Sequence, residues 1–222
     1  MGIATADAAN KDRKILKERM VSVDRLCCLD ALIWLQSGNA VGALTLQHQT
    51  TVSRNQKKCA KSFGIEVLKC DGLWQIKGDR QLLQLERGVH QAARLKFAQN
   101  LRLEAAFSPE GACPTIPGET WVAGTSRIQT RPHISMLLEE RVIDAWLTPA
   151  TPSLVISDSL VEIPLWDTPL AAALVVHRDL RQEQPLAALI ESLMAQHQQR
   201  PVVLHTPEIS ASTSPINHQL MP

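Results

Sequence analysis

Residues 21–80 constrain the fold of this chain more than any other segment, because their apolar residues recur at helical spacing in short runs separated by turns. The spacing predicts three short helices, over residues 22–36, 40–46 and 50–63. Helices of this length are stable in water only when their apolar faces pack against other elements. The segment is therefore predicted to form one small helical unit.

The third predicted helix has two different faces. A thin apolar stripe, suited to the core of the unit, consists of Val52, Cys59, Ala60 and Phe63. The opposite face combines a hydroxyl group with cations, on Ser53, Arg54, Lys57, Lys58 and Lys61. Side chains of these types reach base edges and phosphates when a helix lies in the major groove of DNA. A short helix, a tight turn and a basic helix match the helix-turn-helix plan, although a surface helix with a solvated basic face is the alternative.

A β-hairpin is predicted directly after the third helix. Asp71-Gly72 lies between two short runs, 66–69 and 73–77, and this dipeptide favours a tight hairpin turn. The hairpin would be a wing beside the basic helix, with Lys69 and Lys77 able to reach phosphates. A plain surface hairpin is the other interpretation, and the two do not exclude each other.

The net charge of +1 hides a difference between the two halves of the chain. Residues 1–100 contain 16 Lys and Arg against 9 Asp and Glu, whereas residues 101–222 contain 7 against 13. Every lysine lies in the first hundred residues. Such a split favours a first half that meets a polyanion and a second half that does not. Ordinary solvated surface is the alternative explanation.

Residues 79–106 are predicted to form one long helix with an apolar stripe, because apolar residues follow one another at steps of three and four. A helix with such a stripe needs a partner, and a second copy of the chain is the simplest one. The residues expected at this dimer contact are Leu82, Leu85, Val89, Ala92 and Leu95. The stripe could instead pack on the chain's own second half.

From residue 120 onward, segments with strand patterns alternate with segments with helix patterns, which predicts a layer of strands covered by helices. The expected fold class is an α+β multi-domain chain. Its expected segments are a charged lead-in at 1–20, the helix-turn-helix unit with its wing at 21–80, a linker and dimerisation helix at 81–107, a Pro- and Gly-rich hinge at 108–119, a small α/β domain at 120–204 and a Ser-, Thr- and Pro-rich tail at 205–222.

The sequence indicates no catalytic chemistry. The seven histidines are scattered, and no nucleophile elbow, phosphate-binding loop or dinucleotide-binding pattern occurs. The five cysteines lack metal-ligand spacing, so we expect no metal, no cofactor and reduced thiols in a cytoplasmic protein. No run of about 18 apolar residues predicts a membrane helix, and the polar N-terminus is unlike a secretory signal.

Two further features carry alternatives. Thr125 and Ser126 follow a predicted strand at 120–124, and hydroxyl groups at a strand end could hold the anion or carboxylate of a ligand. A simple turn and helix cap explains the same pair. Cys59, on the inner side of the basic helix, could sense redox conditions, although a small buried thiol that only packs is the simpler account.

Six runs of the sequence, taken in order, carry a family resemblance: 31–38, 51–56, 63–65, 137–146, 163–166 and 174–179. Together they resemble the LysR-type transcriptional regulators over roughly residues 21–200. The resemblance implies a winged helix-turn-helix, a long linker helix and an effector domain built like a periplasmic binding protein. It also implies a dimer or tetramer, and contacts to double-stranded DNA at Thr50, Thr51, Ser53, Arg54 and Lys57.

The chain is short for that family. Only about ninety residues lie between the linker and the tail, enough for roughly one of the two lobes of the usual effector domain. We therefore expect a reduced α/β lobe without the cleft between lobes, which leaves a small-molecule effector in doubt.

Two functions are compatible with these patterns. The first is a sequence-specific transcription regulator that binds double-stranded DNA as a homo-oligomer. The second is a protein–protein adaptor whose winged helix no longer reads DNA. The basic face of the third helix discriminates between them, because an adaptor does not need it. An enzyme is not expected.

Overall fold

The computed structural model of the chain describes residues 22–105, 116–150, 157–167 and 171–199. The predicted lead-in at 1–20, the tail at 205–222 and most of the hinge at 108–119 lie outside these residues. In chain order the elements are α2 (Val23–Leu35), α3 (Gly38–Thr45), α4 (Gln49–Phe63), β1 (Glu66–Cys70), β2 (Leu73–Lys77), α5 (Gln81–Phe97), β3 (Leu101–Glu104), β4 (Trp121–Gly124), α6 (Arg131–Glu139), β5 (Ala145–Pro149), β6 (Leu160–Trp166), β7 (Ala172–His177), the short 3-10 helix η1 (Arg178–Leu180) and α7 (Gln184–Gln199). The mixed α/β composition and the three short helices near the N-terminus agree with the sequence predictions.

Helix α2 is the centre of the N-terminal part of the molecule. Almost every side chain from Leu26 to Leu35 is buried, so the helix is surrounded by other elements rather than lying on the surface. It ends at Gln36, which adopts a left-handed conformation with φ 56°. The side chain of Gln36 bonds the backbone of Trp74 twice, donating to its carbonyl at 3.1 Å and accepting from its N–H at 2.6 Å. Because Trp74 belongs to β2, these bonds fix the hairpin on the helices.

The hairpin itself forms as predicted from Asp71-Gly72. Strands β1 and β2 pair antiparallel, with Glu66 opposite Lys77 and Cys70 opposite Leu73. Asp71 and Gly72 both have positive φ, at 52° and 81°. Two consecutive residues of this kind match a tight turn whose twist suits the flanking strands, and Asp-Gly is the dipeptide that adopts it most readily.

The prediction of one long helix from residue 79 to 106, and of a linker helix reaching residue 107, is wrong. Helix α5 ends at Phe97, and Leu101–Glu104 form the strand β3. Ala98 and Asn100 take left-handed φ values of 48° and 55°, which end the helix and turn the chain. The apolar residues after this point alternate with charged ones instead of continuing the helical stripe. They are buried by strand pairing with β4 and β5.

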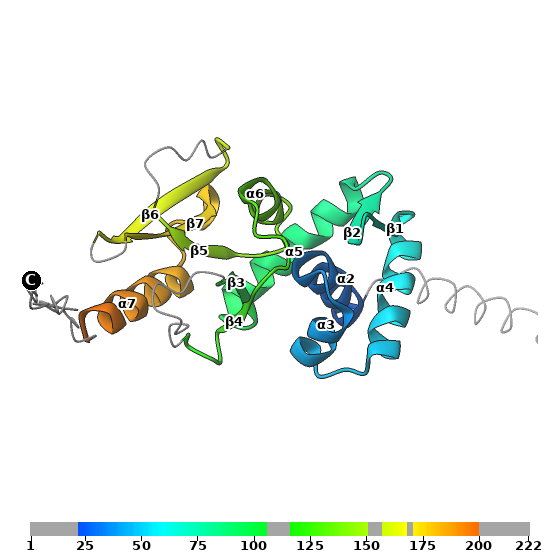
Figure 1. Cartoon of the computed structure of the whole chain (residues 1–222), viewed down its shortest axis with the longest axis horizontal. Helices are drawn as coiled ribbons and strands as arrows, with labels where there is room; N and C mark the ends of the chain where they lie inside the picture. The colour runs from blue at the N-terminus through cyan, green and yellow to red at the C-terminus, as the bar shows by residue number, and fades with distance from the viewer. Residues whose placement is uncertain (1–21, 106–115, 151–156, 168–170, 200–222) are drawn as a thin grey trace, which may run out of the picture.

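The second half is a five-stranded sheet with the order β4-β3-β5-β7-β6 (Figure 1). Strand β3 is parallel to both β4 and β5, whereas β5, β7 and β6 are antiparallel. Helix α7 packs its leucines on one face of the sheet. The other face, around Trp146 and Val175, shares a core with α6 and α2. The described residues of this half contain one sheet.

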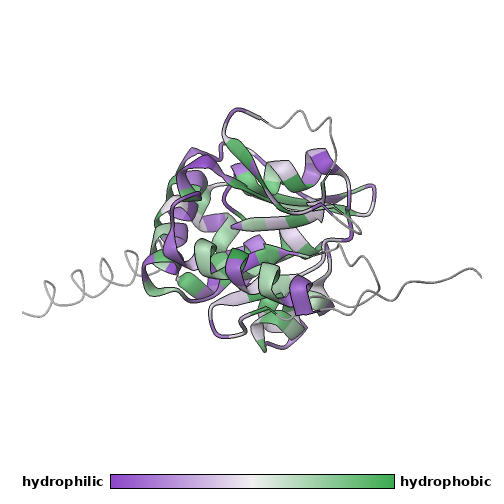
Figure 2. Ribbon diagram, turned by 90° about the vertical axis from the view of Figure 1, so that its left-hand side faces the viewer, coloured by the Kyte–Doolittle hydropathy of each residue, from purple (hydrophilic) through white to green (hydrophobic). Residues whose placement is uncertain are grey.

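One hydrophobic core joins the two halves of the molecule. It runs without interruption from Val52 and Cys59 of α4, through α2, to Ile134 and Leu137 of α6. In Figure 2 the strands of the sheet are coloured mostly as hydrophobic, while the helices around them mix hydrophobic and hydrophilic residues. None of the described helices combines the length and apolar character needed to cross a bilayer.

Trp34 is the side chain through which α2 packs against the sheet. It is fully buried, and its indole ring lies over Gly124 at the end of β4. A Cβ atom added at Gly124 would come within 2.6 Å of Trp34 Cζ2 and 3.0 Å of Leu35 Cδ2. Glycine is therefore required here because of close approach and not because of its backbone angles.

We expect Gly124→Ala to destabilise the protein by about 1–3 kcal/mol, because the buried indole has no room to move away from the added methyl group. Urea unfolding followed by circular dichroism measures the change. The matched control is Gly88→Ala in α5, where an added Cβ meets no atom within 4 Å. That control should stabilise the helix by about 1 kcal/mol. Equal effects of the two substitutions would contradict the close packing of Trp34 on Gly124.

Candidate nucleic-acid interface

Helix α4 lies at one end of the molecule, with the β1–β2 hairpin beside it (Figure 1). Its buried residues, Val52, Gln56, Cys59 and Ala60, face α2 and the core. Gln56 is a polar addition to the stripe predicted from the sequence, and Phe63 is only partly buried. The two-faced character of the third predicted helix is thus present in the structure.

The outward face of α4 carries every polar side chain that the sequence assigned to it. All seven residues are exposed: Thr50, Thr51, Ser53, Arg54, Lys57, Lys58 and Lys61. Within the described part of the chain, none of the four cations among them forms an ion pair with a carboxylate. The helix therefore presents an uncompensated positive surface, with hydroxyl groups near its N-terminus.

The start of α4 is shaped by the turn before it. His48 is the N-cap, and its Nδ1 lies 3.4 Å from the backbone N–H of Thr50, from which it accepts a hydrogen bond. One turn further, Asn55 donates to Gln47 Oε1 at 3.1 Å and so ties the turn to the helix. Leu46, in the same turn, has a left-handed φ of 52° and is almost fully exposed. These contacts fix the direction in which α4 leaves the turn.

The two lysines assigned to the wing are both exposed, but they do not share a face of the hairpin. Lys69 lies opposite Trp74, and its Nζ is 5.9 Å from the centre of the indole ring. Lys77 lies opposite Glu66. Because side chains alternate along a strand, residues 69 and 77 project from opposite sides of the two-stranded ribbon. The sequence prediction assigned Lys69 and Lys77 to the same wing, whereas in the structure they lie on opposite faces of the hairpin.

The arginines between the two halves behave differently from the cations of α4, because they are paired. Arg87 of α5 has no exposed surface, and it donates from Nε to Asp30 Oδ1 at 2.8 Å and from Nη1 to Glu140 Oε2 at 2.7 Å. Arg102 of β3 donates to the other oxygen of Asp30 at 3.1 Å. Burial alone would lower the pKa of Arg102, but Asp30, Cys27 and Asp144 together more than offset this and hold that pKa above its ordinary value.

A second buried carboxylate, Asp144, completes the connection between α5 and the sheet. Its oxygens accept from Arg94 at 2.8 and 3.0 Å and from Gln91 at 2.9 Å, and its Oδ2 accepts from the backbone N–H of Arg102 at 2.8 Å. Both carboxylates are thus saturated with charged or polar donors. Helices α2 and α5 and strand β3 are held in one arrangement by these bonds.

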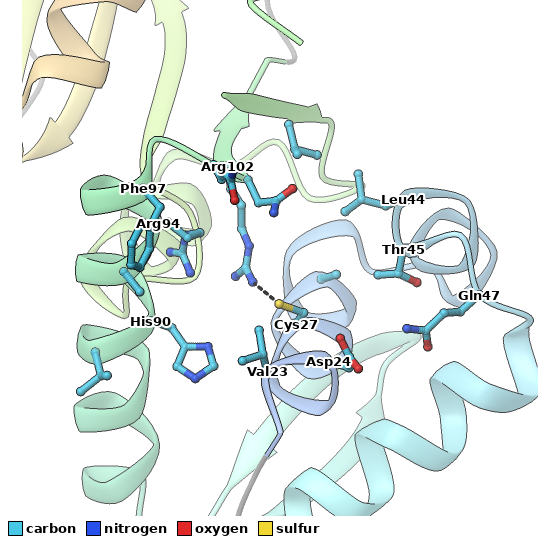
Figure 3. Close-up of a pocket in the computed structure, with 16 residues that line it drawn as sticks. Val23, Asp24, Cys27, Leu44, Thr45, Gln47, His90, Arg94, Phe97 and Arg102 are labelled. Atoms are coloured by element: carbon cyan, nitrogen blue, oxygen red, sulfur yellow. Dashed lines mark hydrogen bonds between the residues drawn. The ribbon is translucent and has the colours of Figure 1, made fainter. Parts of the chain in front are cut away.

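A groove of about 680 Å³ opens where α2, α3 and α5 meet (Figure 3). Its lining is mostly carbon, from Val23, Leu44 and Phe97 among others. At its inner end Arg102 Nη2 lies 3.4 Å from Cys27 Sγ, the contact drawn in Figure 3. Of the residues predicted to be functional, only Val89 borders this groove. Within the described residues, no group of three or more His, Cys, Asp or Glu side chains is arranged to hold a metal ion.

The pair predicted to hold a ligand is engaged inside the chain. Ser126 Oγ accepts from the backbone N–H of Ile128 at 3.1 Å, which is a turn-capping bond. The backbone N–H of Ser126 donates to the carboxylate of Glu104, at 3.0 and 3.2 Å from its two oxygens. Thr125 is exposed, and its hydroxyl lies 3.5 Å from the carbonyl oxygen of Ala105. The sequence did not predict a role for Glu104, because a helix was expected through residue 106 and its position in a strand was not recognised.

The residues predicted to make the dimer contact lie mainly on the open side of α5. Leu82, Leu85 and Val89 are 64, 63 and 64 % exposed. Ala92 is also exposed, whereas Leu95 is half-buried and packs on the core between the sheet and α7. The exposed part of the predicted stripe therefore covers the first three turns of the helix. Phe97, which the prediction did not include, is exposed at the end of the same helix.

Comparison with known proteins gives a consistent but weak likeness. No family model matches the chain, and no curated protein matches it. Among solved structures it is similar to a full-length OxyR variant from Pseudomonas aeruginosa, with 13 % identity and a TM-score of 0.35 over 66 % of this chain and 56 % of that chain. It is also similar to ArgP from Mycobacterium tuberculosis, with 18 % identity and a TM-score of 0.32 over 66 % and 53 % of the two chains.

A third similar structure is CrgA, a LysR-type transcriptional regulator from Neisseria meningitidis, with 13 % identity and a TM-score of 0.29 over 67 % of this chain and 54 % of that chain. Of these three similar structures, CrgA is described as a LysR-type regulator, the family that the sequence resembles. The chain spans a little over half of the length of these three proteins.

The burial of Cys59 bears on whether this thiol could sense redox conditions. Its thiol is fully buried between α4 and α2. Burial, with a smaller contribution from the carboxylate of Asp30, raises the pKa of Cys59 to about 12. Since the thiolate is the reactive form, this thiol should be inert near neutral pH.

We expect iodoacetamide at pH 8 to alkylate the partly exposed Cys27 and Cys70 in the folded protein while Cys59 stays unmodified. Peptide mass spectrometry of the quenched sample measures the three sites separately. After unfolding in urea, Cys59 should react at the same rate as the others. Rapid modification of Cys59 in the native protein would show that this part of α4 opens, and would revive a redox role for it.

Proposed function

We propose that the chain is a DNA-binding transcription regulator of LysR type, in which α4 is the recognition helix. The exposed face of α4 carries this proposal, because it combines three hydroxyl groups with four cations that have no carboxylate partner among the described residues, on a helix at one end of the molecule. A major groove admits an α-helix, and these are side chains that contact phosphates and base edges there. Helices α2 to α4 with the β1–β2 hairpin then form a winged helix-turn-helix.

The side chains of α4 divide by the atoms that they would contact. Thr51, Ser53 and Arg54 lie near the N-terminus of the helix, the end that reaches base edges in helix-turn-helix proteins. The guanidinium group of Arg54 carries parallel N–H donors that can bond two acceptors of a guanine base at once. The cations further along, Lys57, Lys58 and Lys61, are point charges suited to phosphates. Thr50 is placed beside the helix N-terminus, where backbone N–H groups also favour a phosphate.

The hairpin would supply sequence-independent contacts. Lys69, which lies close to the turn of the hairpin, and Lys77, at its base, are both exposed cations without a carboxylate partner in the described residues. The bonds from Gln36 to Trp74 hold this hairpin at a fixed position relative to α2. A fixed wing adds phosphate contacts without a large loss of conformational entropy on binding.

Dimerisation through α5 is the second part of the proposal. Three large apolar side chains at helical spacing, Leu82, Leu85 and Val89, are nearly two-thirds exposed on its open side. Contiguous exposed apolar residues of this kind mark interaction surfaces. A second copy of the same helix is the simplest cover for them, since a two-fold contact brings one stripe against its own equivalent.

We expect Arg54→Ala to weaken binding to a specific site by about 1–3 kcal/mol and to reduce the preference for that site over random duplex. Lys61→Ala should weaken binding to specific and random DNA about equally, because a phosphate contact carries no base information. Fluorescence anisotropy with the upstream region of the chain's own gene and with a random duplex measures both.

Arg127→Ala is the control for charge alone, because Arg127 is an exposed cation in the second half of the chain. It should leave both affinities unchanged. Equal losses on both duplexes for Arg54→Ala and Lys61→Ala would refute the division into base and phosphate contacts. Absence of binding to either duplex at low salt would favour the adaptor function instead.

Leu85→Glu should dissociate the dimer, because it places a charge in the middle of the apolar contact. Sedimentation velocity at micromolar concentration should show a dimer for the native chain and a monomer for the variant. Gln84→Glu introduces the same side chain at the neighbouring exposed position and should remain dimeric. A native chain that sediments as a monomer would contradict this part of the proposal without touching the role of α4.

A further inference from the structure

We infer that Trp34 and Ser126 form a carboxylate-binding site whose ligand is the chain's own Glu104, and that this internal ligand holds the N-terminal helices on the sheet. The site lies where α2 meets the ends of β3 and β4. It is independent of DNA binding, because no residue of the basic face of α4 takes part in it.

The geometry around Glu104 is that of a bound carboxylate. The indole Nε1–H of Trp34 donates to Oε2 at 2.6 Å, and the backbone N–H of Ser126 donates to both oxygens, at 3.0 and 3.2 Å. Glu104 and Trp34 have no exposed surface, and Ser126 is buried too. Hydrogen bonds from fixed donors to a charged acceptor in such a site are stronger than bonds between neutral groups.

The donors are held in place by elements other than the one that carries Glu104. Trp34 belongs to α2, 70 residues away in the sequence, and its ring is seated on Gly124. Ser126 is fixed by the bond that its own Oγ accepts from the N–H of Ile128. A donor pair that is positioned independently of its acceptor would remain in place if the acceptor were removed. It would then be a vacant carboxylate site.

The burial of Glu104 has a cost that these donors offset. Burial raises the pKa of Glu104 above its ordinary value, while the bonds from Trp34 and Ser126, and a smaller contribution from the side chain of Gln129, act in the opposite direction. Without an acceptor, both donors would be buried and unsatisfied, which proteins rarely tolerate. The site should therefore accept another carboxylate from solution when the side chain of Glu104 is shortened.

Glu104→Ala provides the test, since alanine keeps Cβ and the fragment removed has the size and charge of acetate. We expect the variant to melt about 5 °C or more below the native chain. Acetate at about 100 mM should recover at least half of this loss by mass action. Sodium chloride at equal ionic strength and neutral acetamide should recover none.

Two comparison chains make the result specific. The native chain has its site filled, and Glu119→Ala removes an exposed carboxylate from the turn before β4. Neither should gain thermal stability from acetate relative to chloride. Glu104→Gln keeps an acceptor for Trp34 but points an amide donor at the N–H of Ser126, so it should melt at an intermediate temperature and ignore acetate. Equal responses to acetate and chloride in Glu104→Ala would overturn the inference.

The native chain supplies a second test that does not depend on the folding of any variant. With ¹⁵N-labelled tryptophan, the indole N–H of Trp34 should exchange with solvent about tenfold or more slowly than that of the half-buried Trp74. Trp34→Phe assigns the signal. An indole N–H of Trp34 that exchanges as fast as that of Trp74 would show that Glu104 does not hold it, and would overturn the inference by itself.

Discussion

The carboxylate of Asp30 is shared by two buried arginines that come from different parts of the chain. Asp30 lies in α2, Arg87 in α5 and Arg102 in β3. A buried charge is costly unless it is paired, and removal of one partner from such a pair generally costs about 3–5 kcal/mol. Helix α5 and strand β3 therefore cannot leave α2 independently. The central helix of the N-terminal part is at the same time the surface on which the sheet half packs, so the two halves share one core instead of meeting across a flexible joint.

This shared core determines which surface remains open. Helix α2 packs against α4 and also contacts β3 and β4 through Trp34, so α4 can only present its remaining face to solvent. The positive charge of the first half divides accordingly. The arginines in the interior are neutralised by Asp30, Glu140 and Asp144, whereas the cations of α4 have no carboxylate partner in the described residues. The charge difference between the two halves of the sequence thus becomes a positive surface at one end of the molecule.

The parts of the fold that local chemistry controls could be predicted from the sequence. The first three helices have helical spacing of apolar residues, and Asp71-Gly72 favours a hairpin wherever it occurs. Strand β3 could not be found in this way, because Leu101 and Ala105 continue the spacing of α5. Only distant partners in β4 and β5 make Leu101 and Leu103 part of a strand. The alternation of these leucines with Arg102 and Glu104 was the available signal. The hydrogen bond between Trp34 and Glu104 joins residues 70 positions apart, so no local sequence pattern could predict it.

The most direct test of this account is the salt dependence of DNA binding by the full chain. Binding constants for a duplex from the upstream region of its own gene would be measured at several salt concentrations. If the cations of α4 and the hairpin contact phosphates, the plot of log K against log salt concentration should have a slope of about −3 to −5 per bound protomer, as about three to six contacts give. A slope near zero, or no binding at low salt, would mean that the cations of α4 do not contact DNA phosphates, and would contradict the proposed role of this helix.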